Sequence, residues 1–126
     1  MGRILVAGVT EETDQIILVN WFKKEYGEAA AERLHHSPNG GHRSKKTGAK
    51  LKMMGTRPGF PDLVLYLKKG GATGLVVELK KAGQKPRPNQ FDWLDILESC
   101  DFQVHWCDNI EDVKQIFIGY MDEAKK

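Results

Sequence analysis

The sequence has only two cysteines and no apolar run long enough to cross a bilayer. Cys100 and Cys107 are too few for the disulfide framework of a small secreted domain, so we expect both to be packing residues. The apolar stretches, such as QIILVNWF, fall far short of the roughly 20 residues that span a membrane. No N-terminal segment combines a basic flank with a long apolar run. We therefore expect a soluble protein of a reducing, cytoplasmic compartment.

Acidic residues are almost missing from the middle of the chain. Residues 33 to 87 hold thirteen Lys or Arg but only two acids, Asp62 and Glu78, and so carry a net charge of +11 within a chain whose total is +2. A basic segment interleaved with Gly, Ser, Thr and Asn is typical of one that binds a polyanion. Charge alone fits a solvated basic loop equally well. The basic residues concerned are Arg43, Lys45, Lys46, Lys50, Lys52 and Arg57.

The 126 residues, 40% hydrophobic and 29% charged, fit one domain (1–126) with a single core. Thr10 as N-cap, with acids in the next turn, predicts a helix over residues 11–27. EAAAERL either continues this helix or forms a second one. The turn formers of HHSPNGGHRSKKTG (35–48) predict a long loop, and AKLKMMG predicts a brief helix ending at Gly55.

The second half of the chain alternates between strand and helix patterns. RPGF predicts a type II turn, and KKGGATG predicts a hairpin loop between two strands. The expected elements are strands at 62–67, 75–81 and 102–107 and helices at 89–99 and 109–121. The order predicts an α/β fold with a small mixed central sheet flanked by helices.

The hairpin places the two central acids opposite each other. If it is centred on Gly70, Asp62 faces Glu78, whereas a slip of one residue would send Asp62 to the other face. Strand alternation puts Lys80 on the face of Glu78, with the aliphatic residues Leu75, Val77 and Leu79 on the other. A solvated face with an ion pair worth about 0–1 kcal/mol is the alternative to a catalytic group.

Two facing carboxylates repel each other unless a cation lies between them. An oxygen-only site suits Mg²⁺ or Mn²⁺, which on a phosphodiester polarises the phosphoryl oxygen and lowers the pKa of a bound water. Lys80 would orient that water or stabilise developing negative charge. His35, His36 and His42 lack structural-zinc spacing, so we expect them to face DNA or solvent.

FPDLVLYLKKGGATGLVVELKK has the P-D…E-x-K form of the PD-(D/E)XK nuclease superfamily. Glu11 four residues before Gln15, SPNGGHRS, GAKLKMMGTRPGFPDLVL, VVELKK and Gln90 together resemble the virus-type replication and repair nuclease (VRR-NUC) domain over about residues 10 to 121. The resemblance implies a restriction-endonuclease-like α/β core and a metal-dependent endonuclease.

The resemblance also implies roles for individual residues. The metal ligands would be Glu11, Asp62, Glu78 and the backbone carbonyl of Leu79, with Lys80 as the catalytic lysine and Gln15 and Gln90 as supporting groups. Glu12 is the alternative to Glu11. Polar helix surface is the alternative reading of the two glutamines.

Three further positions match or depart from the family pattern. Asn39 and Gly40 match a P-N-G-G turn that either borders DNA or is a plain tight turn. Arg87 stands where similar proteins often carry a serine cap, so we expect the cap to be lost and another phosphate contact to be gained. Trp93 and Trp106, like Phe117, have the spacing of core residues rather than of base-stacking platforms.

The implied function is cleavage of branched DNA by a phage or prophage enzyme resembling Holliday-junction resolvases. One small subunit would carry one site, so symmetric cutting of a four-way junction predicts a homodimer. Two alternatives stay open. One is a nuclease acting on flaps, nicks or duplex ends, and the other is a DNA-binding module without catalysis.

Overall fold

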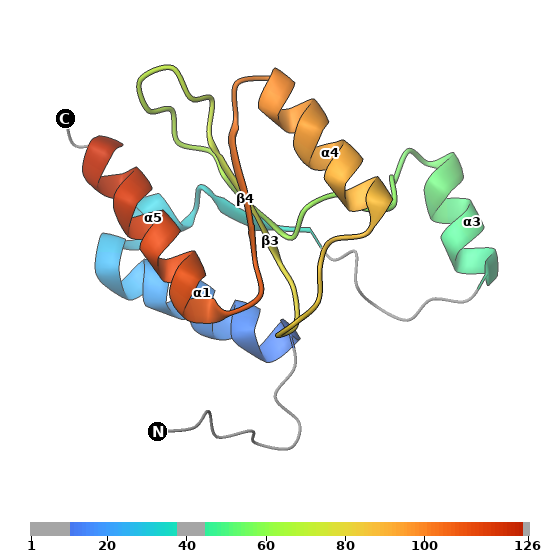
Figure 1. Ribbon diagram of the computed structural model, residues 1–126, viewed down its shortest axis with the longest axis horizontal. Coiled ribbons are helices and arrows are strands. Elements are labelled where there is room, and N and C mark those ends of the chain that lie inside the picture. The colour runs from blue at the N-terminus through green and yellow to red at the C-terminus, as the bar shows by residue number, and fades with distance from the viewer. Residues whose placement is uncertain (1–10, 38–44, 125–126) are drawn as a thin grey trace.

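The computed structural model describes residues 11–37 and 45–124. Figure 1 shows their arrangement as helices packed around a small central sheet. No helix in these ranges is long and apolar enough to cross a membrane. The elements are α1 (Glu11–Tyr26), α2 (Glu28–Ala31), β1 (Leu34–His36), α3 (Lys45–Met53), β2 (Leu63–Leu65), β3 (Leu75–Leu79), α4 (Pro88–Ser99), β4 (Gln103–Cys107) and α5 (Ile110–Ala124).

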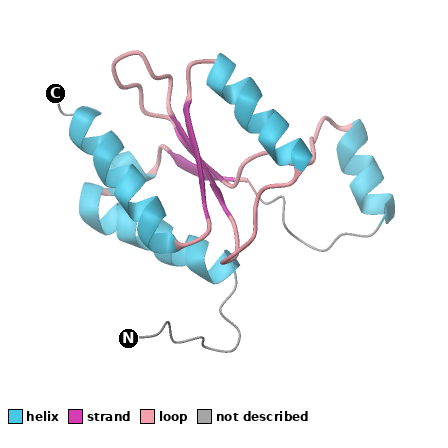
Figure 2. Cartoon of the chain, in the orientation of Figure 1, coloured by secondary structure: helices cyan, strands magenta, loops and turns pink. Residues whose placement is uncertain are grey.

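The sheet has the strand order β1-β2-β3-β4 and is mixed (Figure 2). β1 and β2 are antiparallel, as are β2 and β3, whereas β4 runs parallel to β3. The parallel pair is connected through α4, as a crossover of this kind requires. The predicted α/β fold, a small mixed sheet flanked by helices, is confirmed.

Each face of the sheet has its own apolar cluster, as the alternation along β3 predicts. On one face Leu75, Val77 and Leu79 pack with Leu18, Phe22, Val113, Phe117 and Tyr120 of α1 and α5. On the other face Val64 and Val76 pack against Leu94 of α4. Val64 is paired with Val76, so the predicted hairpin register is correct. Glu78 follows Val76 on the face that α4 covers.

Two elements differ from the prediction between residues 35 and 48. Instead of a continuous loop, the chain forms β1, whose Leu34 pairs with Leu65 of β2. α3 begins at Lys45, before the predicted helix start. Pairing with a neighbouring strand overrides the turn signal in the first case. Thr10 and His42 lie outside the described residues.

The predicted RPGF turn has Gly59 at a φ of 84°, as a type II turn requires at its third residue. A Cβ on Gly59 would lie 3.0 Å from backbone atoms of Asn89 in the first turn of α4. The glycine therefore serves both the turn and the close approach of the turn to α4.

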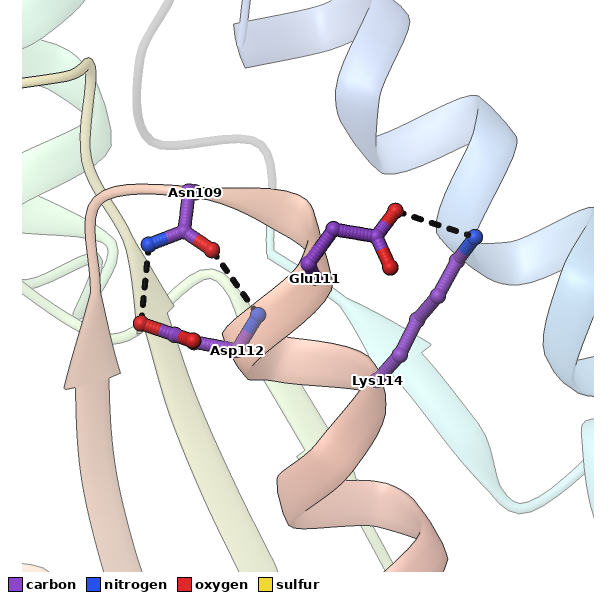
Figure 3. Close-up of polar contacts among 4 residues, drawn as sticks. All are labelled: Asn109, Glu111, Asp112 and Lys114. Carbon is purple, nitrogen blue, oxygen red and sulfur yellow. Dashed lines mark hydrogen bonds and ion pairs between the residues drawn. The ribbon is translucent and has the colours of Figure 1, made fainter. Parts of the chain in front are cut away.

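α5 begins at a cap built by Asn109 (Figure 3). Its Oδ1 accepts a hydrogen bond from the N–H of Asp112 at 2.8 Å, and its amide nitrogen donates to the Asp112 carboxylate at 2.8 Å. Lys114 lies 3.6 Å from Glu111 and 5.7 Å from the ring centroid of Trp21. The cap thus fixes where the chain leaves β4, and Lys114 joins α5 to α1.

Candidate active site

Asp62 and Glu78 meet at the end of the hairpin, where the sequence register places them. Asp62 directly precedes β2, and the next pair in the ladder is Leu63 with Val77. The N–H of Asp62 donates to Oε2 of Glu78 at 3.2 Å, and the N–H of Leu79 donates to Oδ2 of Asp62 at 2.9 Å. Each carboxylate is therefore held by the backbone of the opposite strand.

Gln90, in the first turn of α4, connects the acid to the lysine. Its Nε2 donates to Oε1 of Glu78 at 3.1 Å, and its Oε1 accepts from Nζ of Lys80 at 3.1 Å. The amide can satisfy both partners because it carries a donor and an acceptor. The glutamine predicted as a supporting group thus contacts two other predicted site residues.

These charged groups are withdrawn from water. Glu78 is 2% exposed and Lys80 is 9% exposed. Burial, and then the charge on Asp62, raise the pKa of Glu78 to about 9. Burial also raises the pKa of Asp62, against the opposing effect of its hydrogen bond from Leu79. Two neighbouring acids thus share a site that disfavours their charged forms.

A divalent cation fits this donor set. Asp62 and Glu78 offer hard oxygen ligands, and their mutual repulsion is what a cation between them would relieve. Within residues 11–37 and 45–124, no three His, Cys, Asp or Glu side chains form a metal-holding group. Glu11 is the first residue of α1, and its side chain lies outside the described residues. Its part in the ligand set, like that of the Leu79 carbonyl, stays a prediction.

Gln15 is buried at 9% exposure in α1. It shares a helix face with Leu18 and Phe22, which belong to the apolar cluster on the sheet face opposite Glu78. It therefore approaches from a different side of the sheet than Gln90. The rival acid Glu12 is exposed.

Sequence reasoning missed the support that β1 gives to Asp62. The carbonyl oxygen of Asp62 accepts a hydrogen bond from the N–H of Ser37 at 2.9 Å and lies 3.1 Å from Nδ1 of His36. His35 and His36 are both exposed, as expected for histidines that face solvent, and the ring of His36 also contacts the backbone of a candidate metal ligand. A strand of three residues has too little alternation to be recognised beside a run of turn formers.

The predicted basic contacts lie on the surface. Figure 1 shows α3 at the edge of the molecule beyond α4, and Lys46 and Lys50 lie one turn apart on it. Lys52, Arg57 and Arg87 are exposed as well. Asn39, Gly40, Arg43 and the side chain of Lys45 lie outside the described residues.

The cap of α4 is rebuilt rather than lost. Arg87 occupies the N-cap position, and its side chain has no acceptor for the helix N–H groups. Its own N–H donates to Oε1 of Gln90 at 2.7 Å, which is the reciprocal half of a capping box. The start of α4 is therefore fixed by the same amide that contacts Glu78 and Lys80.

The core prediction is correct for Phe117, which is 1% exposed, but wrong for Trp106, which is 37% exposed. Trp106 lies near the end of β4, the last strand of the described sheet, so no further strand covers its outer flank. Cys107 is buried as predicted, whereas Cys100 is exposed, and both are free thiols.

The chain matches one family model and is similar to a solved structure. The model of the VRR-NUC domain matches residues 9–109. A solved structure described as a VRR_NUC domain protein is similar to this chain, with 27% identity and a TM-score of 0.80, over 94% of this chain and 93% of that one. None of the curated proteins compared with the chain matches it. The matched segment includes Asp62, Glu78, Lys80 and Gln90.

Proposed function

Because the chain belongs to the VRR-NUC domain family of PD-(D/E)XK nucleases, we propose that it is a metal-dependent endonuclease of branched DNA. The observation that carries this proposal is the meeting of the buried carboxylate of Glu78 and the half-buried carboxylate of Asp62 at the end of the hairpin. A lysine held to one of them through Gln90 completes the set. An ordinary surface ion pair needs neither the burial nor the second acid.

Asp62 and Glu78, with Glu11 and the carbonyl of Leu79, would hold Mg²⁺ or Mn²⁺. Such an ion polarises the phosphoryl oxygen, lowers the pKa of water and neutralises the leaving oxygen. The chain itself fixes the ligand geometry, because the N–H groups of Leu79 and Asp62 each orient one carboxylate. These bonds hold the acids in place before substrate arrives.

Lys80 is the group that we expect to orient the attacking water or to stabilise the developing negative charge. Its ammonium already donates to Oε1 of Gln90, so its position depends on the start of α4. A buried cation beside two acids stabilises negative charge more strongly than it would in water. Gln90 acts as a positioning residue, because its contacts are to Glu78 and Lys80.

The exposed lysines of α3 and Arg57 and Arg87 would bind phosphates on either side of the cut. We take a four-way junction as the first substrate, cut symmetrically by a homodimer. We also propose that the chain is a single domain of phage or prophage origin that acts in the cytosol. Flaps, nicks and duplex ends are the second substrate class, favoured by the exposed ring pair of Phe91 and Trp106.

The test is cleavage of labelled four-way junction, flap, nicked and linear DNAs with Mg²⁺, Mn²⁺ or EDTA. We expect paired nicks near the branch point that disappear with EDTA and with Glu78→Gln. Asp95→Asn removes an exposed acid of α4 and is the matched control, which should cut as the wild type does.

Two outcomes would contradict the proposal. Cleavage that survives both Asp62→Asn and Glu78→Gln in folded protein would show that the site is elsewhere. Junction binding without cutting in any metal would favour a DNA-binding module. Light scattering of the free and junction-bound protein tests the homodimer separately, since a monomer in both states removes that part alone.

A further inference from the structure

An exposed aromatic pair lies beside the two acids. In the parallel register of β3 and β4, the partner of Glu78 is Trp106, so both side chains are on the face that α4 covers. The ring of Phe91, the residue after Gln90, lies 6.3 Å from that of Trp106 at an interplanar angle of 89°. Neighbouring strands are about 4.8 Å apart, so the pair is next to the site.

Both rings of the pair are open to solvent. Phe91 is 39% exposed and Trp106 is 37% exposed, although each covers part of the other. On the other flank of α4, Phe60 and Trp93 form a similar pair with centroids 5.3 Å apart. Phe60 and Trp93 are half-buried, whereas Phe91 and Trp106 are among the exposed large apolar residues. The two flanks of α4 therefore differ, and the open one is beside Glu78.

The surroundings of the pair suit a nucleic-acid strand. The segment from the end of β3 to the start of α4 carries Lys81, Lys85 and Arg87, all exposed. Its turn is held in place by a hydrogen bond from the N–H of Gly83 to the carboxylate of Asp108 at 3.0 Å. Side chains that can bind DNA phosphates therefore lie in the segment that connects the end of β3 to the aromatic pair.

We propose that the Phe91–Trp106 pair is a stacking platform for an unpaired base of the nucleotide next to the scissile phosphate. This inference rests on the proposed nuclease function and names its substrate more closely. Only an unpaired base, or one at a helix end or branch point, offers a free ring face for stacking. The preferred substrate therefore has an unpaired nucleotide at the cut, as in a flap or an opened branch point.

The test compares Trp106→Leu, which keeps an apolar side chain without a ring, with Trp106→Tyr, which keeps a ring. Tyr66→Ala is the matched control, because Tyr66 is 51% exposed in a similar pair with Phe102, 6.4 Å away. That pair lies at the opposite end of the strands, beside Leu65 and Gln103. Cleavage rates are measured on a flapped duplex and on a fully paired linear duplex of the same sequence.

Loss of one stacked base is expected to lower binding and cleavage of the flapped DNA about 5- to 150-fold in Trp106→Leu. Trp106→Tyr and Tyr66→Ala should remain within about three-fold of the wild type, given that each leaves the ring platform in place. A second measurement needs no Trp106 variant. A 2-aminopurine base placed beside the cut should lose fluorescence on binding to Glu78→Gln in EDTA.

Three results would overturn the inference. The first is equal cleavage of flapped DNA by Trp106→Leu and the wild type, and the second is a 2-aminopurine that is not quenched. The third is a wild-type dimer that becomes a monomer in Trp106→Leu, because the pair would then be a contact between two copies of the chain. If the wild type cleaves no DNA while a 2-aminopurine at the branch point is quenched, the nuclease proposal fails, and the pair stacks a base without its place beside a cut. If the wild type cleaves but no quenching occurs, the platform alone fails.

Discussion

Replacing Glu78 by glutamine should remove the pH dependence that this buried acid imposes on stability. The folded protein keeps the Glu78 proton up to a pKa of about 9, whereas the ordinary value is 4.5. Between these values the folded state binds more protons than the unfolded chain does. The free energy of unfolding of the metal-free protein must therefore fall as the pH rises through this interval.

The size of the effect follows from the shift. Each pH unit inside the interval lowers the free energy of unfolding by about 1.4 kcal/mol. From pH 5 to pH 7, after allowing for the partly protonated unfolded chain at pH 5, the loss is about 2.5 kcal/mol. Asp62 acts in the same direction, because burial raises its pKa too. Glutamine has no titrating proton, so the Glu78 contribution to the pH dependence of stability is missing in Glu78→Gln.

The assay is denaturant unfolding of wild type and Glu78→Gln in EDTA at pH 5, 6, 7 and 8. The stability of Glu78→Gln relative to the wild type should rise steadily across this series. Asp95→Asn controls for the loss of one acidic charge. A stability difference between Glu78→Gln and the wild type that stays constant from pH 5 to pH 8 would refute the reasoning. Adding Mn²⁺ at pH 8 should stabilise the wild type more than Glu78→Gln.

Four other changes have expected results. Gln90→Leu should lower cleavage about 10- to 100-fold at fixed metal, with circular dichroism unchanged, because it removes the amide between acid and lysine. Asn109→Ala should cost about 1 kcal/mol in denaturant unfolding, because it removes the α5 cap. Gly59→Ala should cost about 1–2 kcal/mol or more, from its φ of 84° and its approach to α4. Changing Lys46 and Lys50 together to glutamine should reduce the slope of log K against log salt by about 2 for duplex DNA, and an unchanged slope would place the phosphates elsewhere.

Local patterns accounted for most of the fold. The alternation along GLVVEL separated the two faces of β3, and the glycine-rich loop was enough to set the register that opposes Asp62 to Glu78. Both signals act over a few residues, so they can be read without knowing what packs against them. The β1 strand could not be found in this way, because its three residues exist as a strand only through pairing with β2.

The sequence by itself determined the chemistry of the site: which acids could face each other, which lysine shares their face, and which segment carries the positive charge. Tertiary structure alone decided three things. α4 brings Gln90 between Glu78 and Lys80, β1 supports the backbone of Asp62, and the edge position of β4 leaves Trp106 open to solvent. The physical reason is the distance along the chain over which each effect acts, since periodicity and turn chemistry involve only near neighbours in the sequence. Burial and hydrogen bonding between distant segments depend on how the helices pack on the sheet.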